Sequence, residues 1–84
     1  MSDKPQKAFN VQFHILQGRN LLIQRNNTYE IEETGVRIWE LCDGAHSIEE
    51  IARVLASEYD VSFEIALADS QQFIQELSAK GLLL

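Results

Sequence analysis

The sequence predicts an α+β domain in which a three-stranded antiparallel sheet is followed by three helices. Two observations carry this prediction. Before residue 34, apolar and polar residues alternate, which is the period of a strand with one buried face. After residue 34, apolar residues recur every three or four positions, which is the period of an amphipathic helix. Because the two periods occupy separate parts of the chain, we expect strands and helices to be segregated.

The expected strands lie between residues 11 and 33. Apolar and polar residues alternate over 11–16, an apolar run follows at 21–23, and alternation returns over 28–32. Gly18, Asn20, Asn26 and Asn27 lie between these segments, where they suit the backbone angles of tight turns at 18–20 and 26–27. The sequence therefore predicts a meander in which residues 28–33 form an edge strand.

Three helices are expected after the sheet. The first has Thr34 as its N-cap and stops at Gly44. The second begins with a capping box, in which Ser47 accepts a hydrogen bond from the backbone of Glu50 and the Glu50 carboxylate reaches back. The third and longest is capped by Ser62 and ends before a short apolar tail.

The helical stripes predict a core centred on Trp39. Because Trp39 and Cys42 share the apolar side of the first helix, we expect the indole to anchor the core and the thiol to be buried and unreactive. The expected partners of Trp39 are Ile51, Leu55, Phe73 and Leu77.

Composition limits the chain to one small domain and excludes several classes of partner. It has 84 residues, with 7 Lys and Arg against 13 Asp and Glu, a net charge of −6. This balance argues against nucleic acid and anionic membranes, both of which need local positive potential. With a single cysteine and no long apolar run, the protein is expected to be cytoplasmic. We expect a flexible N-terminal tail at 1–8 and one domain at 9–84.

No group of residues forms a recognised catalytic or metal-binding pattern. The 4 glycines are scattered at turns and caps, which does not suit a phosphate-binding loop. His14, Cys42 and His46 lack the spacing of metal ligands, and the acidic pairs at 32–33 and 49–50 are typical of solvated or capping side chains. We therefore expect no catalysis, no metal and no cofactor.

The edge strand is the feature most open to function. Its outer N–H and C=O groups lack partners, and such an edge can capture an extended peptide as an added strand. From the strand alone, however, the acidic residues Glu30, Glu32 and Glu33 favour an edge protected against aggregation.

Residues 33–44, ETGVRIWELCDG, resemble the centre of the PqqD family, named for a protein of pyrroloquinoline quinone biosynthesis. In that family the motif I-W-x-L-x-D-G precedes a Ser/Thr-capped helix that contains E-I-A and then L-A-x-x-Y. The matching residues here are Ser47, Glu50, Ile51, Ala52, Leu55, Ala56 and Tyr59, followed by Asp69, Phe73, Leu77 and 81–83. The resemblance extends over about residues 16–84.

The resemblance implies a fold similar to a winged helix-turn-helix and a non-catalytic peptide chaperone. Such domains bind the leader of a ribosomally synthesised precursor peptide by strand addition, beside the last helix. They present it to a modifying enzyme, such as a radical S-adenosylmethionine (SAM) enzyme or a leader protease. The peptide-binding residues expected from this mode and from the edge strand are Thr28, Tyr29, Glu30, Ile31, Glu32, Glu33, Asp69, Gln72, Phe73 and Glu76.

Other functions stay open at this point. A winged-helix nucleic-acid-binding or transcription-regulatory domain has a similar topology, but recognition of DNA needs clustered Lys and Arg. Only Arg53 and Lys80 lie in the second and third expected helices. A small enzyme, or one subunit of a fused or obligate complex, are further alternatives.

Overall fold

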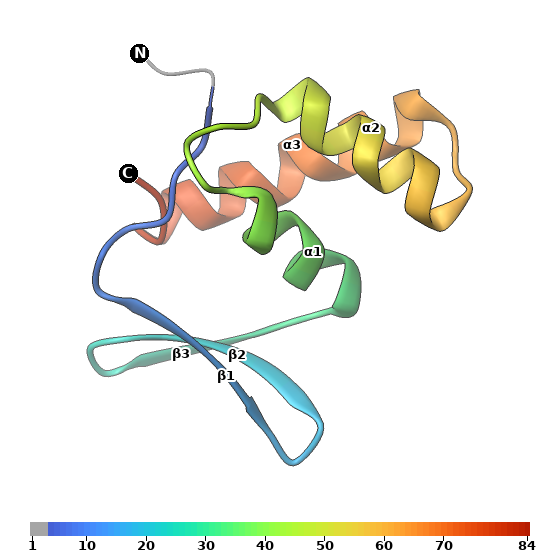
Figure 1. The fold of residues 1–84 in the computed structure, drawn as a ribbon. Coiled ribbons are helices and arrows are strands. Elements are labelled where there is room, and N and C mark those ends of the chain that lie inside the picture. Colours follow the sequence, from blue (N-terminus) through green and yellow to red (C-terminus); the bar gives the residue numbers. More distant parts are fainter. Residues whose placement is uncertain (1–3) are drawn as a thin grey trace.

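The structure is a computed structural model that describes residues 4–84. Its elements are β1 (Val11–Leu16), β2 (Arg19–Gln24), β3 (Asn27–Ile31), α1 (Glu33–Leu41), α2 (Ile48–Tyr59) and α3 (Phe63–Ala79). The strands form one antiparallel sheet in the order β1-β2-β3, which leaves β3 at an edge. Figure 1 shows this sheet on one side of the three helices, so the predicted α+β architecture is confirmed.

Both hairpin turns lie one residue earlier than expected. The β1–β2 turn is formed by Gln17 and Gly18, with φ of 53° and 76°, and the β2–β3 turn contains Arg25, with φ of 54°. Positive φ at both Gln17 and Gly18 matches the right-handed twist of the strands. The turns were misplaced because Gln and Arg, unlike Gly and Asn, give no sequence signal for this conformation.

The predicted N-cap of α1 is also wrong. The helix begins at Glu33, and its N-cap is Glu32, whose side chain makes no capping hydrogen bond. Instead the Glu32 carbonyl accepts the first helical hydrogen bond, from Val36 at 2.9 Å, which places Thr34 inside the first turn. Without a capping side chain at Glu32, the sequence contains no local signal for this start.

The caps of the other two helices are confirmed. At α2, Ser47 Oγ accepts from the Glu50 N–H at 3.1 Å, and Glu50 Oε1 accepts from the Ser47 N–H at 2.8 Å. At α3, Ser62 Oγ accepts from the Ile65 N–H at 3.3 Å. Each cap satisfies a backbone donor that the helix itself leaves without a partner.

The core lies between the sheet and the helices and is centred as predicted. Trp39 is 4% exposed and packs in one cluster with Ile51, Leu55 and Leu77. The expected partner Phe73 is only half-buried at the margin of this cluster. Cys42 is fully buried, and burial raises the pKa of its thiol to about 11. Its burial is confirmed, while its lack of reactivity stays a prediction.

Residues 5–8, expected to be part of a flexible tail, are instead hydrogen-bonded between the end of α1 and the C-terminus. The Lys7 N–H donates to the Cys42 carbonyl at 3.2 Å, and the Ala8 N–H donates to the Leu82 carbonyl at 3.0 Å. These backbone groups find partners in two other segments, a pairing that composition does not signal, and the flexibility of the tail stays a prediction. The rest of the expected tail includes residues 1–3, which lie outside the described residues.

Candidate functional site

A groove of about 950 Å³ runs between β3 and α3. Nine of the ten residues predicted to bind a peptide line it. From β3 and the segment after it these are Thr28, Tyr29, Glu30, Ile31 and Glu32, and from α3 they are Asp69, Gln72, Phe73 and Glu76. The tenth, Glu33, lies in a separate smaller hollow beside the β1–β2 turn.

The helix α3 crosses the groove antiparallel to β3. At the start of β3, the Lys80 ammonium lies 5.5 Å from the centre of the Tyr29 ring. Past the end of β3, the Phe73 ring lies against Gly35, where an added Cβ would be only 2.9 Å from Phe73 Cζ. The groove therefore has two distinct ends, one at Lys80 and one towards Asp69 and the first turn of α1.

The floor of the groove is apolar because of the strand period. Ile31 is buried and Tyr29 half-buried, and both pack against the core, whereas the alternate residues Thr28 and Glu30 are exposed. The half-buried ring of Phe73 continues this apolar surface from α3.

The backbone of β3 directs hydrogen-bonding groups into the groove edge. The two-residue loop between β2 and β3 makes Gln24 and Asn27 a hydrogen-bonded pair, and such pairs alternate along an antiparallel ladder. Tyr29 therefore bonds to β2, whereas the N–H and C=O of Thr28 and Glu30 point away from β2. Across residues 4–84, no other strand pairs with this side of β3.

Several residues of the groove were not predicted. Thr34 and Gly35 from α1, Lys80 after α3, and Tyr59 and Val61 near the link between α2 and α3 complete its walls. Tyr59 and Val61 are 39% and 41% exposed, which makes them the accessible apolar residues at one end of the groove. Their part in the groove depends on how α3 crosses β3, which local sequence patterns do not reveal.

The charge in the groove is mainly negative. Glu30 is paired with Arg19, whose Nη2 lies 2.6 Å from Glu30 Oε1, and this hydrogen bond lowers the pKa of the Glu30 carboxyl. In the part of the chain that the structure describes, the side chains of Glu32, Asp69 and Glu76 make no ion pair or hydrogen bond.

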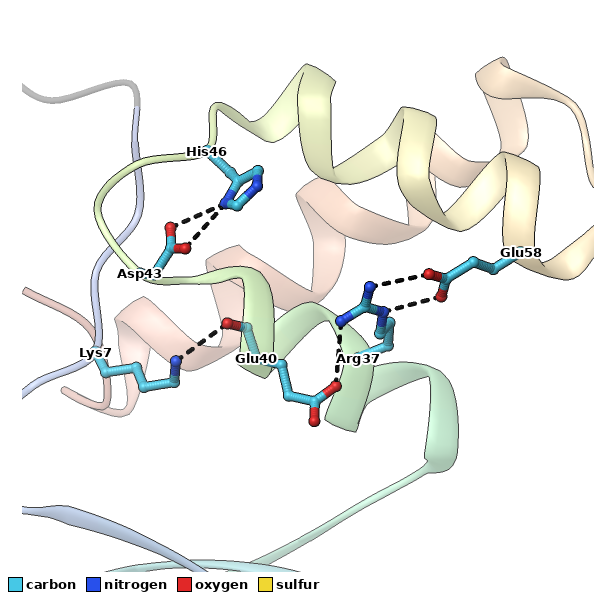
Figure 2. Close-up of polar contacts among 6 residues, drawn as sticks. All are labelled: Lys7, Arg37, Glu40, Asp43, His46 and Glu58. Carbon is cyan, nitrogen blue, oxygen red and sulfur yellow. Dashed lines mark hydrogen bonds and ion pairs between the residues drawn. The ribbon is translucent and has the colours of Figure 1, made fainter.

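A second group of polar contacts lies around α1 and is shown in Figure 2. Arg37 Nε lies 2.9 Å from Glu58 Oε1, which ties α1 to α2, and the Glu58 carboxylate raises the pKa of Arg37. Asp43 lies 3.0 Å from His46 Nδ1, and this contact, with a hydrogen bond from the Ala45 N–H, lowers the pKa of Asp43 to about 2. These contacts connect and end helices, so we assign them a structural role.

The described residues offer neither a metal site nor a basic recognition helix. They contain no group of three side chains that could hold a metal ion, and none of their helices is long and apolar enough to cross a membrane. The cationic groups of Arg53, in α2, and Lys80, directly after α3, lie over the rings of Phe63 and Tyr29. This separation does not favour the alternative of DNA recognition by one helix.

The sequence matches a family of known proteins. The family model of coenzyme PQQ synthesis protein D (PqqD) matches residues 19–83. The bifunctional coenzyme PQQ synthesis protein C/D of Methylorubrum extorquens is 25% identical over 84 residues, which are 98% of this chain and 23% of that protein. The chain thus spans about a quarter of the length of this curated relative.

Three solved structures share the fold. The PqqD part of Methylobacterium extorquens PqqCD, described as a functional and stand-alone recognition element for ribosomally synthesised and post-translationally modified peptides, is 22% identical. It superposes with a TM-score of 0.82 over 100% of this chain and 99% of that one. A lasso peptide synthetase B1 complexed with the leader peptide is 19% identical, with a TM-score of 0.83 over 96% and 98% of the two chains. TbiB1 in complex with the TbiA(beta) leader peptide is 24% identical, with a TM-score of 0.79 over 93% of each chain.

Proposed function

Because this chain belongs to the PqqD family, we propose that it recognises the leader of a ribosomally synthesised precursor peptide and presents it to a modifying enzyme. The observation that carries this proposal is the open edge of β3, which faces a groove with an apolar floor. We assign binding to the domain at 9–84, and the modifying enzyme to the class of radical SAM enzymes or leader proteases. The chain acts in the cytoplasm and contributes recognition rather than catalysis.

In the proposed complex the leader adds a fourth strand beside β3. Its backbone bonds to the outward N–H and C=O groups of Thr28 and Glu30, which supplies affinity that does not depend on sequence. Alternate side chains of the leader then face the floor formed by Tyr29, Ile31 and Phe73. The intervening side chains lie beside Glu30 and Glu32, on the other face of the sheet.

The solved relatives support this assignment. Two of the three structures with the same fold are described as complexes with leader peptides, and the third as a stand-alone recognition element. A protein that only binds and presents a peptide needs an edge and a groove, and both are available here on one side of the molecule.

Proline at position 30 tests strand addition directly. Glu30→Pro removes an outward N–H while leaving the ladder to β2 intact, because this N–H has no partner in the sheet. Glu30→Gln is the matched control, since it weakens the pair with Arg19 but keeps the N–H. We expect the proline variant to bind the synthetic leader of a precursor encoded beside this chain's gene at least about tenfold more weakly than the control.

The experiment requires a folded variant, which circular dichroism and the melting temperature establish. Thr28→Pro removes the other outward N–H and serves as a second variant if Glu30→Pro is unfolded. If folded proline variants bind the leader as tightly as Glu30→Gln does, strand addition at β3 is wrong.

A further inference from the structure

The groove concentrates carboxylates, and most of them have no ion-pair partner among residues 4–84. Four acidic residues line it, Glu30, Glu32, Asp69 and Glu76, against one cation, Lys80, which lies over the Tyr29 ring. Of the four carboxylates only Glu30 has an ion-pair partner within residues 4–84. By contrast, three acidic residues near α1 have partners, because Glu40 and Glu58 both contact Arg37 and Asp43 contacts His46 (Figure 2).

These carboxylates lie on both sides of the position that an added strand would take. Asp69 and Glu76 come from α3, on the side of the apolar floor. Glu30 and Glu32 belong to the exposed set of alternating side chains, on the opposite face of the sheet. Both sets of side chains of a bound peptide would therefore meet negative charge, whichever way its alternation is set.

We propose that the groove selects peptide segments in which Lys or Arg flanks the apolar side chains that fill the floor, and that it rejects acidic segments. This inference rests on the proposed function and adds the chemical class of the ligand. The apolar side chains contact Tyr29, Ile31 and Phe73. Basic side chains directly next to them lie beside Glu30 and Glu32, and basic side chains two positions away, on the floor side, reach Asp69 and Glu76. Lys80 offers the one position along the groove that suits an acidic side chain.

The charges act on selectivity more than on total affinity. All three unpaired carboxylates belong to exposed residues, so each ion pair with a peptide is worth a few-fold in affinity and weakens with added salt. An acidic peptide segment lacks these ion pairs and is also repelled by the carboxylates. The ratio of affinities between basic and acidic peptides is therefore larger than attraction or repulsion alone would give.

The test selects ligands without assuming a natural one. A displayed library of random peptides is selected on the full chain, and groove binders are identified as those that lose binding to Glu30→Pro. Among these peptides we expect Lys and Arg to be enriched over the starting library and Asp and Glu to be depleted. Their affinity should decrease as the NaCl concentration is raised from about 0.05 M to about 0.5 M.

Two triple variants with the same change of net charge separate a local from a general effect. E32Q/D69N/E76Q neutralises the groove, whereas E49Q/D60N/E64Q neutralises three exposed carboxylates that do not line it. We expect the first to bind the selected peptides at least about fivefold more weakly than the second.

Each outcome decides a different statement. Groove binders without basic enrichment, or equal affinities for the two triple variants, overturn the charge selectivity and leave peptide recognition standing. If no selected peptide is sensitive to Glu30→Pro, peptide recognition at this edge is overturned, and the selectivity with it.

Discussion

Gly35 shows how a single residue shapes the groove. It lies buried in the first turn of α1, in contact with the Phe73 ring, and its lack of a side chain allows this close approach. An alanine Cβ would lie 2.9 Å from Phe73 Cζ and 3.1 Å from Phe73 Cε1, so the ring has to move. Because Phe73 is half-buried beside the groove, the ring can move into the space that the proposed peptide would take.

We therefore expect Gly35→Ala to fold, since alanine favours a helix by up to about 1 kcal/mol over glycine. Because the displaced Phe73 ring occupies part of the groove, we expect the variant to bind peptide at least about tenfold more weakly. Titration with the leader measures the affinity, and NMR of the aromatic side chains reports the position of Phe73. Adding Phe73→Leu, which shortens the side chain, should restore part of the affinity. Unchanged Phe73 resonances in Gly35→Ala would show that the contact does not constrain the ring.

Asp43 is one of the groups that link the stability of the fold to pH. His46 and the Ala45 N–H lower the pKa of Asp43 to about 2 in the folded state, against an ordinary value of 3.8. Between these two values the unfolded chain binds a proton that the folded chain does not. The stability that Asp43 contributes is therefore complete above about pH 4 and is lost as the pH falls towards 2.

Asp43→Asn removes the carboxyl that takes up this proton, and so tests whether Asp43 contributes this stability. Above pH 5 we expect the variant to melt at a lower temperature than the parent, because the amide replaces a charged acceptor. Between about pH 4 and pH 2 the two melting temperatures should converge. The other carboxyls with lowered pKa, Glu30, Glu50 and Glu58, are common to both proteins, so the difference isolates Asp43. Melting curves that stay a constant interval apart would contradict this role.

Among the helices and strands, the sequence predicts an element correctly where neighbouring residues contain all the side chains that define it. The α2 helix combines a capping box with an amphipathic stripe, and both lie as predicted. The start of α1 was misplaced because Glu32 holds it through a backbone carbonyl, and the hairpin turns because Gln17 and Arg25 adopt positive φ. A backbone carbonyl as cap and a positive φ at Gln or Arg give no residue-type signal that the sequence could show.

The residues of the groove likewise fall into a predicted and an unpredicted set. The alternation of β3 and the helical spacing of α3 are local, so they predicted nine residues that the structure brings together. Lys80, Tyr59 and Val61 join them only because of the antiparallel crossing of α3 and β3. No period in the sequence encodes that crossing.

Trp39 decides whether α1 stays in place. This helix has only 9 residues, too few to be stable alone, and it depends on the burial of its apolar side. Trp39 is 4% exposed in the core, so we expect Trp39→Ala to cost about 3–5 kcal/mol and to unfold much of so small a domain. Chemical denaturation measures the loss, with Trp39→Phe as a milder control. A decrease in the melting temperature of only a degree or two in Trp39→Ala would show that Trp39 does not stabilise the core.

At the scale of the whole molecule, the two ends of the described chain hold each other. Residues 5–8 lie between the segment after α1 and the C-terminal residues 82–84, on one side of the molecule in Figure 1. On one side, the Gly44 N–H donates to the Pro5 carbonyl at 2.9 Å. On the other, the Leu84 N–H donates to the Gln6 carbonyl at 2.8 Å. The same C-terminal segment supplies Leu82 to the groove, so this pairing also supports one end of the site.

Removal of residues 1–8 tests this arrangement. The truncation deletes the partners of four backbone hydrogen bonds, two to each neighbouring segment. We expect a loss of at least about 2 kcal/mol and a fall in melting temperature of at least about 10 °C, because each such bond contributes about 0.5–1.5 kcal/mol net of the bonds to water that replace it. Removal of residues 1–3 alone is the control. Hydrogen exchange locates the effect, since the amides of Gly44 and Leu84 lose their acceptors in the longer truncation only. If both truncations melt together and these two amides stay protected, residues 5–8 do not stabilise the fold, and the C-terminal segment is held by α3 and the core alone.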